Sequence, residues 1–291
     1  MPSTDDDLRC RFDAAGLGAK ASALLDLRRP GVRLISRPVD EADLARGSSR
    51  LGGRPDLPAS FEWPAYRELP LAFVGQIDLA EMHAYDAERV LPSQGLLSFF
   101  YDADEAGVWG FDPADRGGWA VAFTPAEMAL ERREHPVGVG DYARFPSAAL
   151  IPQAELGWAP RESSELWQVL EGPTEWAAYA EVAGLDQDGL AWPDETRHRL
   201  LGHPDPLQGD MQAECQLVSH GVYCGDPSGY TGSQAEALLP GAADWRLLFQ
   251  VDSDDTVDIM WGDVGRLYYW IHRDRLAERA WDQCWLILQC S

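Results

Sequence analysis

Basic residues are scarce in this chain of 291 residues. Lysine and arginine together number 24 against 48 aspartates and glutamates, and Lys20 is the only lysine. The formal net charge is therefore −24. Binding to nucleic-acid phosphates, or to an anionic membrane surface, requires a basic face. The composition argues against both as partners, and it is compatible with a cationic partner.

Long apolar segments and paired cysteines are also lacking. No run approaches the roughly 18 apolar residues that indicate a membrane-spanning helix. The N-terminus, MPSTDDDLRC, has neither the basic nor the apolar region of a secretory signal. Five cysteines, an odd number spread over the chain, do not suggest a disulfide framework. We expect a cytoplasmic protein with reduced thiols.

The sequence mixes strand and helix signals without regular alternation. Strand patterns cover residues 32–36, 71–77, 95–101, 119–123, 245–251, 266–272 and 285–289. Helical patterns cover residues 17–29, 163–183 (interrupted at Gly172-Pro173) and 274–281, and further helix starts are expected at Asp78 and Thr124. The Gly- and Pro-rich segments 46–64 and 198–232 indicate loops. These patterns favour an α+β fold with mixed, largely antiparallel sheets and short helices.

Three short motifs occur twice, in the same order. They are GRPD at 53–56 and GHPD at 202–205, GQID at 75–78 and FQVD at 249–252, and GLLSFF at 95–100 and GRLYYW at 265–270. We interpret them as an internal duplication of a β-rich half, packed as one pseudo-symmetric unit. Two such halves would leave a cleft between them.

Polar residues in the repeated turns are the first candidates for chemistry. His203 beside Asp205 and Asp210 has the composition of an acid/base pair, and Asp56 would face it across the cleft. The alternative is that these are Pro-Asp turns whose carboxylates cap their own backbone. No GxSxG motif and no glycine-rich phosphate-binding loop accompanies them.

Two patterns weakly resemble metal sites. Borderline zinc ligands are gathered between residues 198 and 224, at His198, His203, Cys215, His220 and Cys224, but without CxxC or HExxH spacing. Acidic residues follow a calcium-loop register at Asp252, Asp254, Asp258 and Asp263, with Thr256 between them and no glycine at the sixth position. We interpret the first as scattered cysteines and histidines and the second as a solvated turn. We expect no resident metal and no cofactor.

Several long segments resemble the bacterial YwqG-like proteins. They are LGGRPDLP, FVGQIDL, LPSQGLLSFFYD, LLGHPDPLQGDMQAECQLVSHGVYCGD, WRLLFQVDSD and MWGDVGRLYYWI, in matching order from about residue 32 to the C-terminus. The resemblance implies a domain of unknown function with an α+β fold and no established enzyme activity. It also implies an immunity role, which was proposed because members occur near polymorphic toxin genes. The family's recurrent polar positions correspond to Asp56, Gln76, Asp78, Asp205, Gln208, Asp210, Gln250, Asp252 and Asp263.

We therefore expect a helical extension over residues 1–31 and a YwqG-like domain over 32–291. Its two repeats, about 32–145 and 185–291, would be joined by a helical segment. The leading hypothesis is a protein-binding module, such as an immunity or regulatory protein whose partner is a basic toxin. The alternative is a small-molecule or metal-dependent enzyme with its site in the cleft between the halves.

Overall fold

The computed structural model describes residues 4–103, 108–185 and 196–290. The strands of the main sheet are β1 (Arg29–Pro38), β2 (Arg50–Leu51), β6 (Ala72–Asp78), β7 (Leu96–Tyr101), β8 (Trp119–Thr124), β10 (Ala148–Gly157), β11 (His198–Leu201), β12 (Trp245–Asp252), β13 (Arg266–His272) and β14 (Trp285–Gln289). Two small ladders pair β3 (Asp56–Leu57) with β9 (Glu131–Arg132) and β4 (Ala65–Tyr66) with β5 (Leu69–Pro70).

The described residues also form short α-helices. These are α1 (Asp5–Ala14), α2 (Ala21–Asp26), α3 (Leu79–Met82), α4 (Ser164–Trp167), α5 (Gly172–Ala183), α6 (Met211–Ser219), α7 (Ser233–Leu238) and α8 (Arg273–Ala277). No helix in the described ranges is long and apolar enough to cross a membrane.

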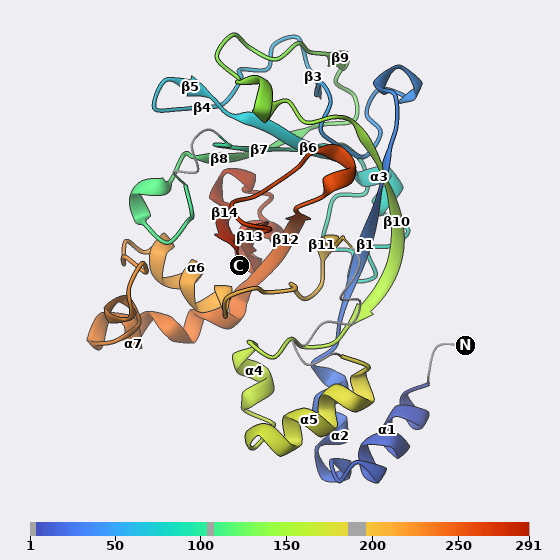
Figure 1. Ribbon diagram of the computed structural model, residues 1–291, viewed down its shortest axis with the longest axis vertical. Coiled ribbons are helices and arrows are strands. Elements are labelled where there is room, and N and C mark those ends of the chain that lie inside the picture. Colours follow the sequence, from blue (N-terminus) through green and yellow to red (C-terminus); the bar gives the residue numbers. More distant parts are fainter. Residues whose placement is uncertain (1–3, 104–107, 186–195, 291) are drawn as a thin grey trace.

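One ten-stranded sheet organises the molecule, in the order β14-β13-β12-β11-β1-β10-β2-β6-β7-β8 (Figure 1). All of its neighbouring strands pair antiparallel. The long strands β1 and β10 lie at its centre. We call β2, β6, β7 and β8 the first arm, and β11, β12, β13 and β14 the second arm. The expected α+β class with largely antiparallel strands is confirmed.

The two arms curl towards each other and enclose most of the core. The rings of Phe99 on β7 and Phe249 on β12 lie 4.6 Å apart, centroid to centroid. The hydroxyl of Tyr269 donates to the carbonyl of Phe100 at 3.1 Å, and the indole N–H of Trp119 donates to the carbonyl of Cys284 at 3.0 Å. The sheet is therefore nearly closed, and its arm strands other than β8 are buried on both faces. This explains why β6 and β12 read as almost continuous apolar runs rather than alternating ones.

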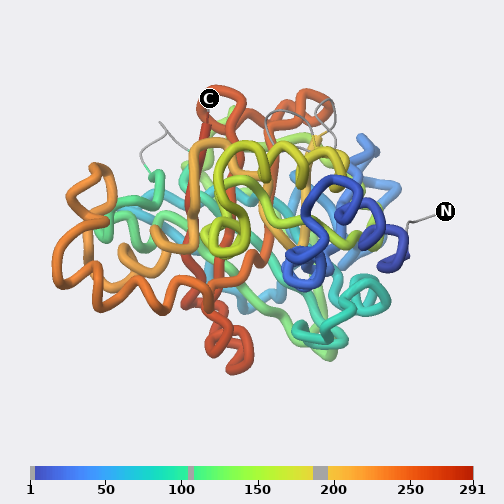
Figure 2. Tube along the Cα trace, turned by 90° about the horizontal axis from the view of Figure 1, so that it is seen from below, coloured from blue at the N-terminus to red at the C-terminus, as the bar shows by residue number. Residues whose placement is uncertain are grey.

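Four helices form a separate helical bundle beside the sheet. Helices α1 and α2 from the N-terminus pack with α4 and α5, and Figure 2 shows the blue N-terminal segment beside the yellow-green one. The bundle has its own apolar cluster, which includes Phe12, Leu24, Leu166 and Tyr179, all fully buried.

Most sequence-based elements are confirmed. The strands β6, β7, β8, β12, β13 and β14 lie where their patterns indicated, and the helical segment 163–183 is divided into α4 and α5 as expected. Asp78 caps α3 by accepting the N–H of Ala80. Strand β1 extends beyond the expected 32–36 at both ends.

Three expectations are wrong. Residues 46–64 are not simply a loop, because they contain the short strands β2 and β3. Thr124 ends β8 and leads into a turn, not a helix, because the chain becomes extended again to pair β9 with β3. Residues 198–232 are not simply a loop. They contain β11 and also α6, which Asp210 caps at its N-terminus.

The two arms repeat the same pairing. Gln76 lies opposite Ser98, and Gln250 lies opposite Tyr268. In both β6 and β12 the register shifts just before the glutamine, between Phe73 and Gly75 and between Leu247 and Phe249. The repeated sequence motifs thus have equivalent places in the sheet. Their origin by duplication stays a prediction.

Candidate functional site

A buried carboxylate, that of Asp56, is held by two arginines. Its oxygens accept hydrogen bonds from Arg50 Nη1 at 2.7 Å and Arg132 Nε at 3.0 Å, and from the N–H of Gly47 at 2.9 Å. Burial raises the pKa of the Asp56 carboxyl, but the hydrogen bonds from Arg132 and Arg50 outweigh it, and the pKa lies well below its usual range. Asp56 is therefore an ionised, paired group. We call Asp56, Arg50, Arg132 and Gln76 the Asp56 network.

A second buried carboxylate, that of Asp205, has a similar environment. It lies 3.1 Å from Arg197 Nη1 and 3.2 Å from Arg199 Nη1. Burial opposes its ionisation, but the charges of Arg199 and Arg197 keep the pKa of the Asp205 carboxyl below its ordinary value. Its backbone carbonyl accepts from the hydroxyl of Tyr268 at 2.7 Å. We call Asp205, Arg197, Arg199 and Gln250 the Asp205 network.

Glutamines complete both networks in the same way. The carboxamide oxygen of Gln76 accepts the N–H of Asp56 at 2.9 Å, and that of Gln250 accepts the N–H of Asp205 at 2.8 Å. Each glutamine Nε2 also donates to the carboxylate of the same aspartate, at 3.1 and 3.0 Å respectively. Both Pro-Asp turns are therefore fastened to the adjacent strand by a buried side chain.

The two networks lie on different parts of the sheet. Arg50 is on β2 and Arg199 is on β11, and β10 and β1 lie between these strands. At about 4.8 Å per strand, the separation along the sheet is about 14 Å. The structure therefore does not gather Asp56 into one constellation with His203, Asp205 and Asp210.

Comparison with known families covers most of the chain. The sequence model of the family described as "Domain of unknown function (DUF1963)" matches residues 49–290. The chain belongs to the DUF1963 family. The match includes both networks and begins just before Arg50, whereas α1 and α2 lie outside it. No curated protein matches this DUF1963 chain.

The remaining carboxylates that sequence reasoning selected have local partners in this DUF1963 protein. Asp78 caps α3, and Asp210 caps α6 by accepting the N–H of Gln212 at 2.9 Å. Asp252 accepts from Arg266 Nε at 2.7 Å and from the N–H of Arg197 at 2.9 Å. These roles fit the alternative in which the acids stabilise the backbone nearby.

Two selected residues lie outside the networks. Gln208 and Asp263 are exposed. The backbone N–H of Gln208 donates to the carboxamide oxygen of Gln289 at 3.1 Å, but its own side chain adds nothing to the Asp205 network. Neither side chain lines a site with the other selected residues.

His203 has a structural hydrogen bond. Its Nε2 lies 2.7 Å from the carbonyl of Leu27 and therefore carries the proton. The pKa of His203 is lowered to about 3, mainly by burial and next by the charge of Arg29. The ring is neutral at physiological pH and binds the carbonyl rather than forming an acid/base pair with Asp210, whose carboxylate caps α6.

The residues of the two weak metal patterns are not gathered. Within the described ranges, no group of three His, Cys, Asp or Glu side chains could hold a metal ion. His220 Nδ1 lies 2.7 Å from the carbonyl of Gln216, and the thiols of Cys215 and Cys224 are buried. In the acidic loop, a carboxylate oxygen of Asp254 lies 3.1 Å from His198 Nε2. The carboxylate also accepts hydrogen bonds from the hydroxyls of Ser36 and Thr256.

Sequence reasoning missed the arginines that pair with these acids. Arg50 stands six residues before Asp56, and Arg199 stands six residues before Asp205. The repeats are therefore longer than GRPD and GHPD: they read RLGGRPD and RLLGHPD. An aligned arginine at a fixed distance from a repeated aspartate was the signal that could have revealed both ion pairs.

Proposed function

We propose that this DUF1963 chain is a bacterial cytoplasmic protein-binding module, of the immunity or regulatory kind, whose partner is a cationic protein. The proposal rests on the location of the acidic side chains, most of which lie at the surface. Among the described residues, the buried acids are six aspartates: Asp56, Asp86, Asp115, Asp205, Asp252 and Asp254. Most of the 48 acidic side chains therefore remain at the surface. A surface field of one sign attracts a partner of the opposite sign and speeds its association.

The resemblance to YwqG-like proteins supports the same proposal. It is the source of the immunity role and of the expectation that the partner is a toxin. The family match adds that this is a domain of unknown function, and it specifies no activity.

The enzyme alternative has little support in the geometry. His203 and Asp210 line one small pocket, whose volume of about 20 Å³ suits a single water molecule rather than a substrate. Asp56 and Asp205 do not line it. Their carboxylates are buried and paired with arginines, so a reacting group would reach them only if an ion pair were broken.

The test is binding to a toxin encoded beside the gene in its native host. We expect a complex whose association rate falls at least tenfold between 50 and 500 mM salt, because salt screens the attraction between exposed charges. Lysozyme, a basic protein without such a relationship, serves as the control and should bind far more weakly. A neighbouring toxin that kills equally well with and without this chain would overturn the proposal.

A further inference from the structure

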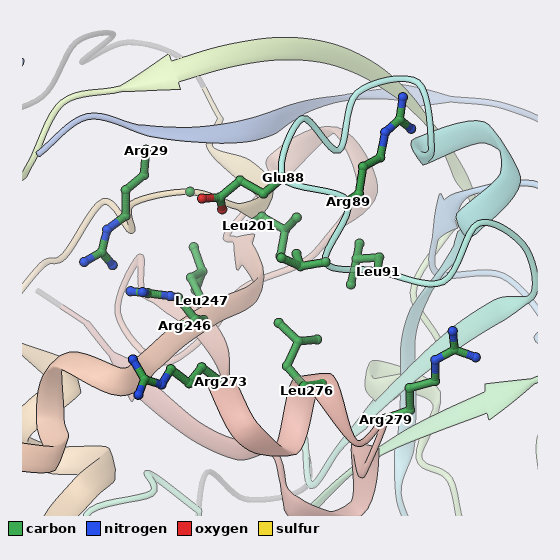
Figure 3. Close-up of a pocket in the computed structure, with 13 residues that line it drawn as sticks. Arg29, Glu88, Arg89, Leu91, Leu201, Arg246, Leu247, Arg273, Leu276 and Arg279 are labelled. Atoms are coloured by element: carbon green, nitrogen blue, oxygen red, sulfur yellow. The ribbon is translucent and has the colours of Figure 1, made fainter. Parts of the chain in front are cut away.

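An arginine-lined pocket lies between the ends of several strands and α8 (Figure 3). Its volume is about 380 Å³. The charged residues that line it are Arg29, Glu88, Arg89, Arg246, Arg273 and Arg279. Among the described residues, five arginines and a single acid thus line this cavity, in a protein in which acids outnumber bases two to one. The local charge is opposite to that of the whole chain.

Three of the guanidinium groups gather on one side of the pocket. Figure 3 shows Arg29, Arg246 and Arg273 there, whereas Arg89 and Arg279 lie on the other side of the leucines. Arg29 pairs with Glu165 at 2.6 Å and Arg273 with Asp244 at 2.9 Å.

Arg246 has the weakest partner of the three. Its Nη1 has a long hydrogen bond of 3.4 Å to the carbonyl of Ala243, and within the described residues no carboxylate lies within salt-bridge distance. Burial is the largest cause that lowers the pKa of Arg29, and the neighbouring charge of Arg246 lowers it further. A bound anion would relieve the repulsion between these two guanidinium groups.

The rest of the pocket is apolar. Leu91, Leu201, Leu247 and Leu276 line it, and each is at most 7% exposed. In Figure 3 the leucines lie between the group of three arginines and the other two, with Leu247 beside Arg246 and Leu91 towards Arg89. No aromatic side chain of the described ranges lines the pocket, so these residues offer no surface on which a nucleobase could stack.

The backbone around the pocket is unusual. Arg89, Leu201 and Arg279 have φ values of +55°, +60° and +58°. They are three of the seven non-glycine residues with positive φ in the described part of the chain. Such conformations are strained and gather at ligand sites.

We propose that this pocket binds an aliphatic carboxylate, with its head group at Arg246, Arg29 and Arg273 and its chain on the four leucines. Guanidinium groups bind carboxylates through paired, charge-assisted hydrogen bonds. Glu88, Glu165 and Asp244 already lie near the three arginines, so one negative charge suits the site better than two. The volume is near the small end of ligand pockets, which limits the length of chain that the pocket can hold. This inference does not depend on the proposed protein-binding function.

The experiment is calorimetric titration of the full chain with hexanoate, octanoate and decanoate. We expect one bound ligand per chain, and an affinity that rises about fourfold for each added methylene buried on the leucines. Decyltrimethylammonium, which has the same chain and a positive head, should not bind. Equal affinity for 1-decanol and decanoate would overturn the role of the arginines, and tighter binding of decyl phosphate would overturn the choice of a single charge.

Two variants on α8 give a matched comparison. The side chains of Arg273 and Arg275 are 58% and 52% exposed, but only Arg273 lines this pocket, and Arg275 pairs with Glu278 at 2.7 Å. Arg273→Gln should weaken decanoate binding at least tenfold, because a charged hydrogen bond is lost, and Arg275→Gln should leave it within twofold. Arg246→Gln should also weaken it at least tenfold, with thermal melting as the check that it folds. Equal effects of the Arg273 and Arg275 variants would contradict the proposal.

Discussion

Gln76 and Gln250 occupy the same position in the two arms of the sheet, and each holds an aspartate by two hydrogen bonds. Both side chains are fully buried. A buried carboxamide in such a place cannot be exchanged for an apolar group without leaving its partners unsatisfied. The two glutamines therefore fasten the Pro-Asp turns to the sheet.

Replacing either glutamine by leucine should destabilise the protein. Gln250→Leu leaves the N–H of Asp205 without its acceptor, and we expect a loss of about 2–3 kcal/mol in the free energy of unfolding. Gln76→Leu should behave similarly at Asp56. Urea denaturation measures the effect, with the exposed Gln234→Leu as the control. Loss of less than about 0.5 kcal/mol in both core variants would show that the hydrogen bonds do not fasten the turns.

Acid should weaken the Asp56 network. The pKa of Asp56 is lower in the folded protein than in the unfolded chain, so its contribution to stability is complete above the ordinary aspartate pKa of about 3.9 and is lost as the pH falls below it. Asp56→Asn should cost about 3–5 kcal/mol at pH 7, because Arg50 and Arg132 lose their buried counter-charge. The variant should also show a smaller fall in stability between pH 5 and 3 than the parent. The exposed Asp6→Asn should neither lower the stability at pH 7 nor change its fall between pH 5 and 3. The prediction would be contradicted if the stability of Asp56→Asn and of the parent fell by equal amounts between pH 5 and 3.

Glu214 should make the stability of the protein depend on pH in the opposite direction. The pKa of Glu214 is raised to about 7, mainly by burial and next by the charge of Asp210. Its ionisation is therefore harder in the folded protein, and stability falls as the pH rises from about 4.3 to about 7. Glu214→Gln should be more stable than the parent by about 1–2 kcal/mol at pH 8, and of similar stability at pH 4. Chemical denaturation at the two pH values tests this, and a variant that is less stable at pH 8 would disprove it.

The helical bundle should unfold before the sheet when its core is weakened. Phe12 is fully buried, with its ring centroid 6.3 Å from that of Tyr179 and 5.9 Å from that of Trp158. Phe12→Ala should cost about 3–5 kcal/mol, a large part of what a small bundle contributes. Hydrogen exchange should then show lost protection in α1 and α5 and retained protection in β12. Val137→Ala, at a fully exposed position, is the control. Equal loss of protection in bundle and sheet would contradict this separation.

Local sequence patterns predicted those strands well that consist of continuous apolar or aromatic residues. β6 and β13 are examples, because burial on both faces leaves a strong signal in the sequence. Helix α6 was missed because glycine and proline in the flanking segments dominated the pattern of 198–232. At Thr124, the helix signal was overruled by the pairing of β9 with β3, a contact that no local pattern contains.

The candidate residues were predicted unevenly. Asp56 and Asp205 were identified as equivalent, and the structure places each in a matching network. Their arginine partners were not identified, although the spacing from Arg50 to Asp56 recurs. The arginine pocket gave no signal at all, because Arg29, Arg246 and Arg273 come from segments far apart in the chain.

The sequence by itself determined the fold class, the repeated motifs and the excess of negative charge, because these follow from composition and from hydrophobic patterns along the chain. Only the tertiary structure decided what the acids do. Pairing of distant strands carries Arg132 to Asp56, and the packing of segments far apart in the chain gathers the five pocket arginines around one cavity. Burial then determines which carboxylates are paired inside and which remain on the surface, and burial is a property of the folded chain rather than of any one segment.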